Sequence, residues 1–239
     1  MKSFLQELRH VLRRLLDYQI VQITMVLSVV FAVLMAVFPV IDPLNFVSLS
    51  LFIMPVILFS IATFLYRDDD PVKCEHPSKH PVRCSVVAQL VASVLIHTLP
   101  FIIYTTILVA RGHHFNIILL FLSFSAAALL HTLIGMVLAI TSKTSRQVAY
   151  SYLVYILVFS LSPILYINGI IPYSMQYVML ISPAYVSGLL IDNVLAGAQY
   201  SSDWLVWLAI VFELGGIFLL IRFAVVPFFS HQHLINKPE

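Results

Sequence analysis

Apolar residues run along this chain in stretches long enough to cross a lipid bilayer, separated by shorter polar connections. A hydrocarbon core of about 30 Å needs roughly 20 residues of helix, because each residue adds about 1.5 Å. Since every backbone group in lipid must be paired internally, these stretches are expected to be helices. The pattern predicts an all-α integral membrane protein with six transmembrane helices, at 20–41, 44–66, 86–110, 115–141, 147–168 and 204–227.

The segment between the fifth and sixth spans is too polar and too interrupted to cross a membrane. We expect residues 169–203 to form an extracellular segment of broken helices, re-entrant or interfacial, and two half-spans are the alternative. Its tyrosines suit headgroup depth, where a ring stays in lipid and its hydroxyl in water. The residues concerned are the interruptions Pro172, Pro183, Gly188 and Gly197, the polar Asp192, Asn193, Gln199 and 201–203, and the aromatic Tyr173, Tyr177, Tyr185 and Tyr200.

Ahead of the first span, the apolar residues recur at helical spacing and the arginines fall on other faces. This pattern predicts an amphipathic interfacial helix at 1–19, followed by one membrane domain at 20–239. Such a helix lies on the cytoplasmic surface with its cations toward anionic lipid headgroups. A purely anchoring role and an additional role in docking a partner both remain open. The apolar set is Phe4, Leu8, Val11, Leu12 and Leu15, and the cationic set is Arg9, Arg13 and Arg14.

Composition supports the membrane assignment independently. Hydrophobic residues make up 61% of the chain and charged residues 10%, against roughly 25% charged in a soluble domain. The mean hydropathy is +0.99 and the sequence pI is about 8.5. Because the basic residues lie in the connections, no nucleic-acid-binding face is expected.

The distribution of Lys and Arg predicts the orientation. Twelve of the 13 Lys and Arg residues fall before the first span, after the second, after the fourth or at the end of the chain, and Arg111 alone falls on the other side. Short loops rich in Lys and Arg stay cytoplasmic. We therefore expect both termini and the connection at 67–85 to be cytoplasmic, in the plasma membrane of a bacterial cell.

Several enzymatic signatures are missing from the sequence. A phosphate-binding loop G-x-x-x-x-G-K-[ST] is excluded because no Gly-Lys pair occurs, and neither H-E-x-x-H nor G-x-S-x-G is present. We expect no catalytic residues in this chain, and any ATP hydrolysis that drives it must occur in another chain.

The nearest approach to a metal site lies in the connection at 67–85, with the spacing C-x-H-x3-H-x3-C. These ligand types suit zinc, but the spacing matches no standard zinc ribbon or finger. A plain polar connection without metal is the favoured interpretation, and reduced thiols are expected in the cytoplasm. The four residues are Cys74, His76, His80 and Cys84.

The ionisable residues inside the spans are His97, His131, Glu213 and, near the cytoplasmic end of the sixth span, Arg222. Such groups are costly in lipid and face a bundle interior or a water-filled path. For Glu213, contact with substrate or proton and a helix-packing hydrogen bond near Gly215 and Gly216 are both open. For the histidines, a satisfied bond within or between helices is favoured.

Three stretches together resemble the permease subunits of type 2 ATP-binding-cassette (ABC) exporters. They are YRDDDPVKCEHPSKHPVR at 66–83, LIGMVLAITSKTSRQ at 133–147 and SPILYINGIIPYSMQYVMLISP at 162–183. The resemblance also includes the amphipathic first helix, the six spans and the broken extracellular segment. The Glu-Arg pair and glycine that are frequent in this family after the second span are replaced here by Arg67 and three aspartates.

The resemblance implies that the connection at 67–85 supplies a coupling helix to cytoplasmic ATPase subunits, which bind the ATP and Mg²⁺. It also implies a second permease, identical or not, so that one chain forms half of a pore within the membrane lipid. The residues expected to face the ATPase are Pro77, Ser78, Lys79, Pro81 and Arg83.

By the same resemblance, a translocation path lies between the second and fifth spans of the two permeases. A purely structural role for each proline and hydroxyl there is an equal alternative. An amphipathic substrate such as a drug, lipid or hydrophobic peptide is expected, because few charges line the spans. The rivals are a membrane assembly or immunity subunit without transport, and an intramembrane enzyme using His97, His131 and Glu213. The candidate path residues are Pro55, Ser60, Thr63, Ser160, Ser162, Pro163 and Glu213.

Overall fold

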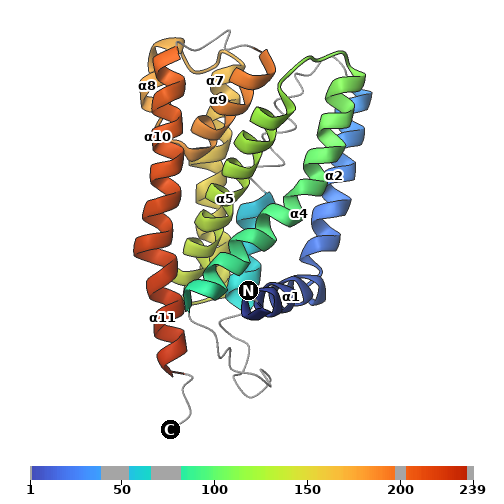
Figure 1. Ribbon diagram of the computed structural model, residues 1–239. Coiled ribbons are helices and arrows are strands. Elements are labelled where there is room, and N and C mark those ends of the chain that lie inside the picture. Colours follow the sequence, from blue (N-terminus) through green and yellow to red (C-terminus); the bar gives the residue numbers. More distant parts are fainter. Residues whose placement is uncertain (1, 39–53, 66–81, 197–202, 236–239) are drawn as a thin grey trace.

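The computed structural model of the 239-residue chain describes residues 2–38, 54–65, 82–196 and 203–235, and within these ranges the regular structure is entirely helical (Figure 1). The helices are α1 (Lys2–Asp17), α2 (Ile20–Val37), an unlabelled helix Met54–Leu65, α4 (Val82–Ala110), α5 (Ile117–Thr141), α6 (Ser145–Tyr155), η1 (Ile156–Ser160), α7 (Leu161–Ile167), η2 (Tyr173–Met175), α8 (Gln176–Met179), α9 (Pro183–Ala196), α10 (Asp203–Leu220), η3 (Ile221–Val225) and α11 (Val226–Ile235).

Five stretches of helix are long and apolar enough to cross a membrane: Ile20–Val37, Val86–Ala110, Ile117–Thr141, Ser145–Tyr166 and Trp204–Ser230. The described residues are thus all-helical, as predicted, and these apolar helices are compatible with a membrane protein; they coincide with five of the predicted spans. The predicted span at 44–66 is described only as Met54–Leu65, which by itself is too short for a core of about 30 Å. Residues 44–53 and 66 lie outside the described residues.

Side-chain hydrogen bonds cap the first turns of α5 and α6. The Asn116 side-chain oxygen accepts hydrogen bonds from the backbone N–H groups of Ile118 and Leu119, at 3.0 and 3.2 Å, and starts α5. Thr144 accepts from the N–H of Gln147 at 3.3 Å, while the Gln147 side chain accepts from the N–H of Lys143 at 2.8 Å. These reciprocal bonds satisfy N–H groups that the first turn of a helix leaves unpaired, so α6 starts directly after the short turn that follows α5.

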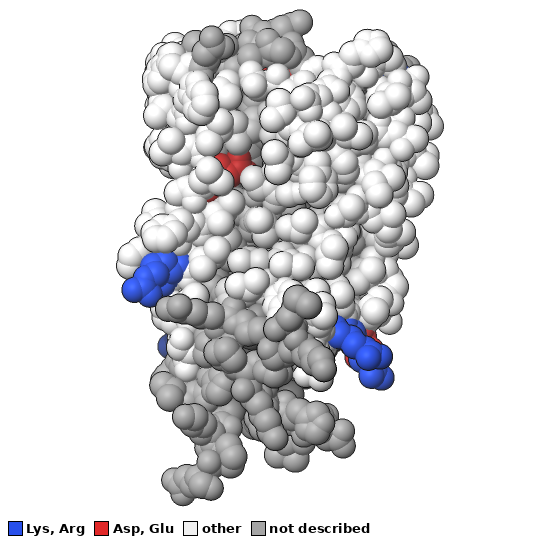
Figure 2. All heavy atoms as spheres, viewed as in Figure 1, with Lys and Arg blue, Asp and Glu red and all other residues white. Residues whose placement is uncertain are grey.

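Helix α1 lies across the lower end of the bundle, the end at which α11 also lies (Figure 1). Val11 and Leu15 of α1 are buried in a core cluster shared with helix Met54–Leu65, α4, α5 and α11, whereas Arg9 and Arg13 are exposed. The predicted amphipathic helix is therefore present. On the face shown in Figure 2, the blue atoms lie in the lower half, and the body above them is uncharged apart from a small red area.

Helix α5 makes its closest approach to helix Met54–Leu65 at Gly135. A Cβ added at Gly135 would collide with the backbone carbonyl oxygen of Val56, which belongs to that neighbouring helix. Small residues permit such approaches between membrane helices. Since backbone atoms cannot move aside as a flexible side chain can, this contact requires glycine.

Arg111, the basic residue predicted on the side opposite the others, lies in the turn between α4 and α5. Its guanidinium donates to the backbone carbonyl of Met35 at 3.4 Å, in the last turn of α2. The last carbonyls of a helix have no partner within it and carry partial negative charge. Arg111 therefore ties the upper ends of α2 and α4 together.

At the upper end, the segment Tyr173–Met179 and the stretch Pro183–Leu195 form a helix pair bent by 115°. Pro172 and Pro183 stand at the starts of η2 and α9, as their missing N–H groups favour. Gly188, by contrast, lies inside α9 and does not interrupt it, so that part of the prediction is wrong. Gly188 is buried, and packing offsets the roughly 1 kcal/mol that glycine costs a helix.

The predicted layer of tyrosines is only partly present. Tyr173 and Tyr177 are exposed, with 55% and 51% of their surface accessible, but Tyr185 is 5% accessible. Its ring packs edge-on against Tyr166 at a centroid distance of 5.3 Å. Tyr185 is therefore a core residue of the upper end, since α9 turns it toward α7, and Tyr200 lies outside the described residues.

Substituting alanine at Gly135 tests the close approach of the two helices. We expect G135A to lower the free energy of unfolding by roughly 1–3 kcal/mol, because the added methyl group forces the helices apart. The melting temperature of the purified protein in detergent measures this.

G215A is the matched control, because a Cβ at Gly215 meets nothing within 4 Å. It should be neutral or slightly stabilising, as expected for glycine replaced by alanine in a helix. A melting temperature for G135A equal to that of G215A would show that the helices do not meet at this point.

Candidate functional site

The residues expected to contact an ATPase fall almost entirely outside the described part of the chain. Pro77, Ser78, Lys79 and Pro81 lie outside it, and Arg83 is described only as a backbone position in the first turn of α4. The same holds for the Cys and His residues weighed as zinc ligands. Cys74, His76 and His80 lie outside the described residues, and only the backbone of Cys84 is described.

The predicted path residues of the second span lie on helix Met54–Leu65 and are buried: Pro55, Ser60 and Thr63. The Ser60 hydroxyl donates to the carbonyl of Ile57 in its own helix at 2.8 Å. Neighbouring residues of this helix belong to the lower core with α1 and α5. In this chain the three residues therefore face protein and not lipid.

The predicted path residues of the fifth span, Ser160, Ser162 and Pro163, lie where η1 passes into α7. Pro163 has no N–H to offer the carbonyl of Phe159, which is four residues earlier. That carbonyl instead accepts a hydrogen bond of 2.6 Å from the Ser182 hydroxyl, across 23 residues of sequence. Ser182 thus supplies the partner that Pro163 removes.

Ser182 has a second role at the start of α9. Its hydroxyl oxygen accepts from the backbone N–H of Tyr185 at 3.3 Å, and Pro183 occupies the first position of the helix. A serine cap followed by proline is a strong signal for the start of a helix. The bend between α8 and α9 is thereby fastened to the middle of the fifth span.

Both π-helical segments lie just ahead of a proline. η1 (Ile156–Ser160) precedes Pro163, and η3 (Ile221–Val225) precedes Pro227. A π-turn pairs each carbonyl with the N–H five residues later instead of four, so it helps the chain to pass a position without an N–H. The prolines therefore shape the fifth and sixth spans without ending them.

The two histidines are bonded within their own helices. Nδ1 of His97 donates to the carbonyl of Ser93, and Nδ1 of His131 to that of Ala127, each at 2.8 Å. His97 also stacks on Phe59, and His131 packs edge-on against Tyr155, each at a centroid distance of 6.3 Å. Each histidine therefore makes the bond within its helix that the sequence favoured, through one ring nitrogen. Nε2 of His97 is buried without a hydrogen-bond partner among the described residues.

A hydroxyl pair beside the histidines joins α4 to α5. Ser93 Oγ and Thr132 Oγ1 lie 2.7 Å apart, both fully buried. Ser93 is also the residue whose carbonyl His97 contacts, and Thr132 follows His131 directly. The four side chains form one polar layer between the two helices, at about the middle of each.

Glu213 forms a separate polar contact between α9 and α10. Ser187 donates to its Oε1 at 3.0 Å, and Glu213 is 1% exposed. Its Oε2 has no hydrogen-bond partner among the described residues. Gly216 meets only Leu130 of α5, at 3.3 Å from an added Cβ, and Gly215 is open, so one of the two glycines lies at a helix contact.

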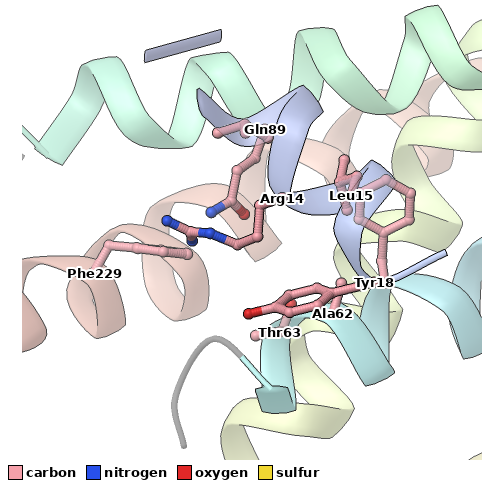
Figure 3. Close-up of a pocket in the computed structure, with 9 residues that line it drawn as sticks. Arg14, Leu15, Tyr18, Ala62, Thr63, Gln89 and Phe229 are labelled. Carbon is pink, nitrogen blue, oxygen red and sulfur yellow. The ribbon is translucent and has the colours of Figure 1, made fainter. Parts of the chain in front are cut away.

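A small pocket of about 30 Å³ lies at the lower end of the bundle, between α1 and the helices that α1 crosses. Arg14, Gln89 and Tyr18 turn their polar ends toward the same space, beside Thr63 (Figure 3). The walls are apolar and come from α1, helix Met54–Leu65 and α11, namely Val11, Leu15, Phe59, Ala62 and Phe229. Thr63, a predicted path residue, therefore faces this pocket.

Several residues of these contacts were not predicted from the sequence. Ser182, Ser187, Ser93 and Thr132 act through partners on other helices, and Gln89 joins a pocket formed by four separate elements. A lone serine within an apolar helix carries no signal of its partner. The Ser-Pro pair at 182–183, which predicts a capped helix start, is the one signal available from the sequence.

Comparisons of the chain with protein-family models, curated proteins and solved structures gave no match.

The bond from Ser182 to the Phe159 carbonyl can be tested by a double-mutant cycle. S182A should destabilise the protein by about 1–3 kcal/mol, because it leaves a buried carbonyl unpaired and removes a cap. P163A restores an N–H that can reach this carbonyl. In the P163A background S182A should therefore cost only the cap, about 1 kcal/mol.

Chemical or thermal unfolding of the four proteins in detergent measures the cycle. S162A is the matched control, because no hydrogen bond of the Ser162 side chain occurs within the described ranges, and it should change stability by less than about 0.5 kcal/mol. Equal costs for S182A in both backgrounds would disprove the link to Pro163.

Proposed function

We propose that this chain is the permease subunit of a type 2 ABC exporter. It lies in the plasma membrane with both termini in the cytoplasm, and separate ATPase subunits drive it. Its substrate is amphipathic, because the buried residues of the described bundle supply mainly hydroxyls and aromatic rings, and the few buried ionisable residues are Glu7, His97, His131 and Glu213.

The arrangement at the lower end carries this proposal. Helix Met54–Leu65 leads into the connection at 67–85 and α4 leads out of it, and both belong to the same core cluster as Val11 and Leu15 of α1. The described helices on either side of this connection therefore pack in one body with the amphipathic helix. Protein interiors are close-packed and transmit displacement, so a push on the connection would move that body as a unit.

Charge supports the orientation. Among the described basic residues, those of α1, of the first turn of α4 and of the turn between α5 and α6 lie toward the lower end, and Arg111 lies at the opposite end. Placing the lower end in the cytoplasm keeps most of the cations on the side where short basic loops are retained. Arg111 is compensated by its bond to the carbonyl of Met35.

The upper segment fits a re-entrant hairpin on the extracellular side. Tyr177 stacks on Trp204 at the start of α10, at a centroid distance of 5.5 Å, while Ser182 reaches Phe159 within the fifth span. Ile191 of α9 then returns to the core cluster that contains Leu120 in the first turn of α5. In this arrangement η2 and α8 run from the upper end toward the middle of the fifth span, and α9 returns to the upper end.

The candidate path belongs to an assembly of two permeases. Ser160, Ser162 and Pro163 lie on a span that packs against α5 and α9 on one side, whereas Tyr150, Leu153 and Leu157 are exposed on the other. The Glu213 side chain of α10 contacts α9, so any role of Glu213 in transport would require α9 and α10 to separate. Its bond to Ser187 is sufficient for a packing role alone.

Co-purification tests the exporter function. The chain is expressed with a tag in its native cells, purified together with the proteins bound to it, and assayed for ATP turnover in nanodiscs. We expect an ABC ATPase to co-purify, and P81A or R83Q to lower turnover several-fold, because on this proposal the connection contacts the ATPase. R146Q is the control, since Arg146 is an exposed cation of another connection.

Turnover that depends on Pro81 and Arg83 but not on Arg146 supports the exporter. A protein that carries out its cellular role with no ATPase bound would instead indicate an assembly or immunity subunit. Loss of a hydrolytic activity on E213Q, without any ATPase, would indicate the intramembrane enzyme.

A further inference from the structure

The pocket between α1 and the helices that it crosses combines one cation, three neutral hydrogen-bond donors and an apolar wall. The donors are the Arg14 guanidinium, the Tyr18 and Thr63 hydroxyls and the Gln89 amide, and they come from α1, the turn after it, helix Met54–Leu65 and α4. Among the described residues that line the pocket, none carries a carboxylate. The lining therefore favours an anionic group over a cation or a purely apolar ligand.

The position of the pocket indicates which kind of anion can reach it. It opens at the end of the bundle where α1 lies across the helices, and Val11, Leu15 and Phe229, which form part of its wall, belong to the lower core. On the lipid side of this helix Leu5 and Leu16 remain exposed, at 56% and 46%. A helix with this pattern lies at the boundary between headgroups and acyl chains, which is where a phospholipid presents its phosphate.

We propose that this pocket binds the phosphate of an anionic phospholipid, with the first part of an acyl chain along the apolar wall. Arg14 supplies the charge, and the hydroxyls of Tyr18 and Thr63 and the amide of Gln89 donate to the remaining phosphate oxygens. A guanidinium has five N–H donors in a fork that matches phosphate. Arg14 can therefore keep its 2.8 Å bond to Nε2 of His10 and contact the lipid at the same time.

The volume of about 30 Å³ accepts phosphate oxygens at the mouth and not a whole headgroup. The lipid is therefore recognised by its phosphate and its charge, and the headgroup beyond the phosphate projects out of the pocket. This site differs from general attraction to α1, because Arg9 and Arg13 are exposed and do not line the pocket. The bound lipid would fasten α1 to helix Met54–Leu65 and α4.

The full-length protein, purified in a neutral detergent, provides the test. Phosphatidylglycerol and phosphatidylcholine with identical acyl chains are titrated separately, and binding is followed by native mass spectrometry and by the melting temperature. We expect phosphatidylglycerol to bind at least tenfold more tightly than phosphatidylcholine and to raise the melting temperature. Inorganic phosphate alone should have little effect, because it cannot use the apolar wall.

R14Q and R13Q form the matched pair, since each removes one charge from α1 but only Arg14 lines the pocket. R14Q should weaken phosphatidylglycerol binding at least tenfold, and R13Q less than threefold. Q89L is a second variant that keeps all the charges of α1, and it should weaken binding severalfold. Circular dichroism and gel filtration establish that each variant is folded, and if R14Q is not, Q89L and R14K provide the comparison.

Equal losses for R14Q and R13Q would overturn the proposal, because they would indicate attraction to the surface of α1 as a whole. Equal binding of the two lipids would overturn it as well. A response to inorganic phosphate as large as that to phosphatidylglycerol would identify a site for free phosphate instead of lipid. None of these results depends on an ATPase, so the site and the exporter function can fail independently.

Discussion

The constraint that organises this molecule is that a backbone carbonyl inside a membrane must have a hydrogen-bond donor. Pro163 deprives the carbonyl of Phe159 of its usual donor, and Ser182 replaces it at 2.6 Å. Because the same serine caps α9, the position at which the chain bends after α8 is determined by a proline in the preceding span. The carbonyl of Phe159, which lacks its usual donor within the helix, thereby connects the fifth span to the segment that follows it.

A second constraint, that a hydroxyl or ring N–H buried among apolar groups must find an acceptor, accounts for many polar side chains within the described spans. Thr24, Ser28, Thr98 and Thr106 each donate to the carbonyl four residues earlier, and both buried histidines do the same through Nδ1. A polar residue in an apolar helix is thus no sign of a site by itself. The contacts that cross between helices carry more information, and they include Ser93 with Thr132, Ser182 with Phe159 and Ser187 with Glu213.

Sequence alone predicted what depends on local pattern. The spans follow from apolar length, and the first helix follows from the spacing of Val11 and Leu15. The Nδ1 bonds of the two histidines follow from the cost of leaving a ring N–H unpaired in lipid. The partners of Ser182 and Gly135 could not be predicted, because they lie on other helices and depend on how those helices pack. Tyr185 was misplaced for the same reason, since the direction of α9 and not its composition buries that ring.

Packing divides the described bundle into a lower and an upper part. The lower core joins α1, helix Met54–Leu65, the first half of α4, the second half of α5 and α11. Two upper cores join the ends of α2 and α4 with the first half of α5, α7, α9 and α10. The fifth and sixth spans pass between these parts through η1 and η3, where the usual hydrogen-bond ladder is interrupted. Because π-turns and prolines are the places where helices bend, a displacement that begins at the lower end would be absorbed at these two segments, and Ser182, bonded to η1, would carry it into α9.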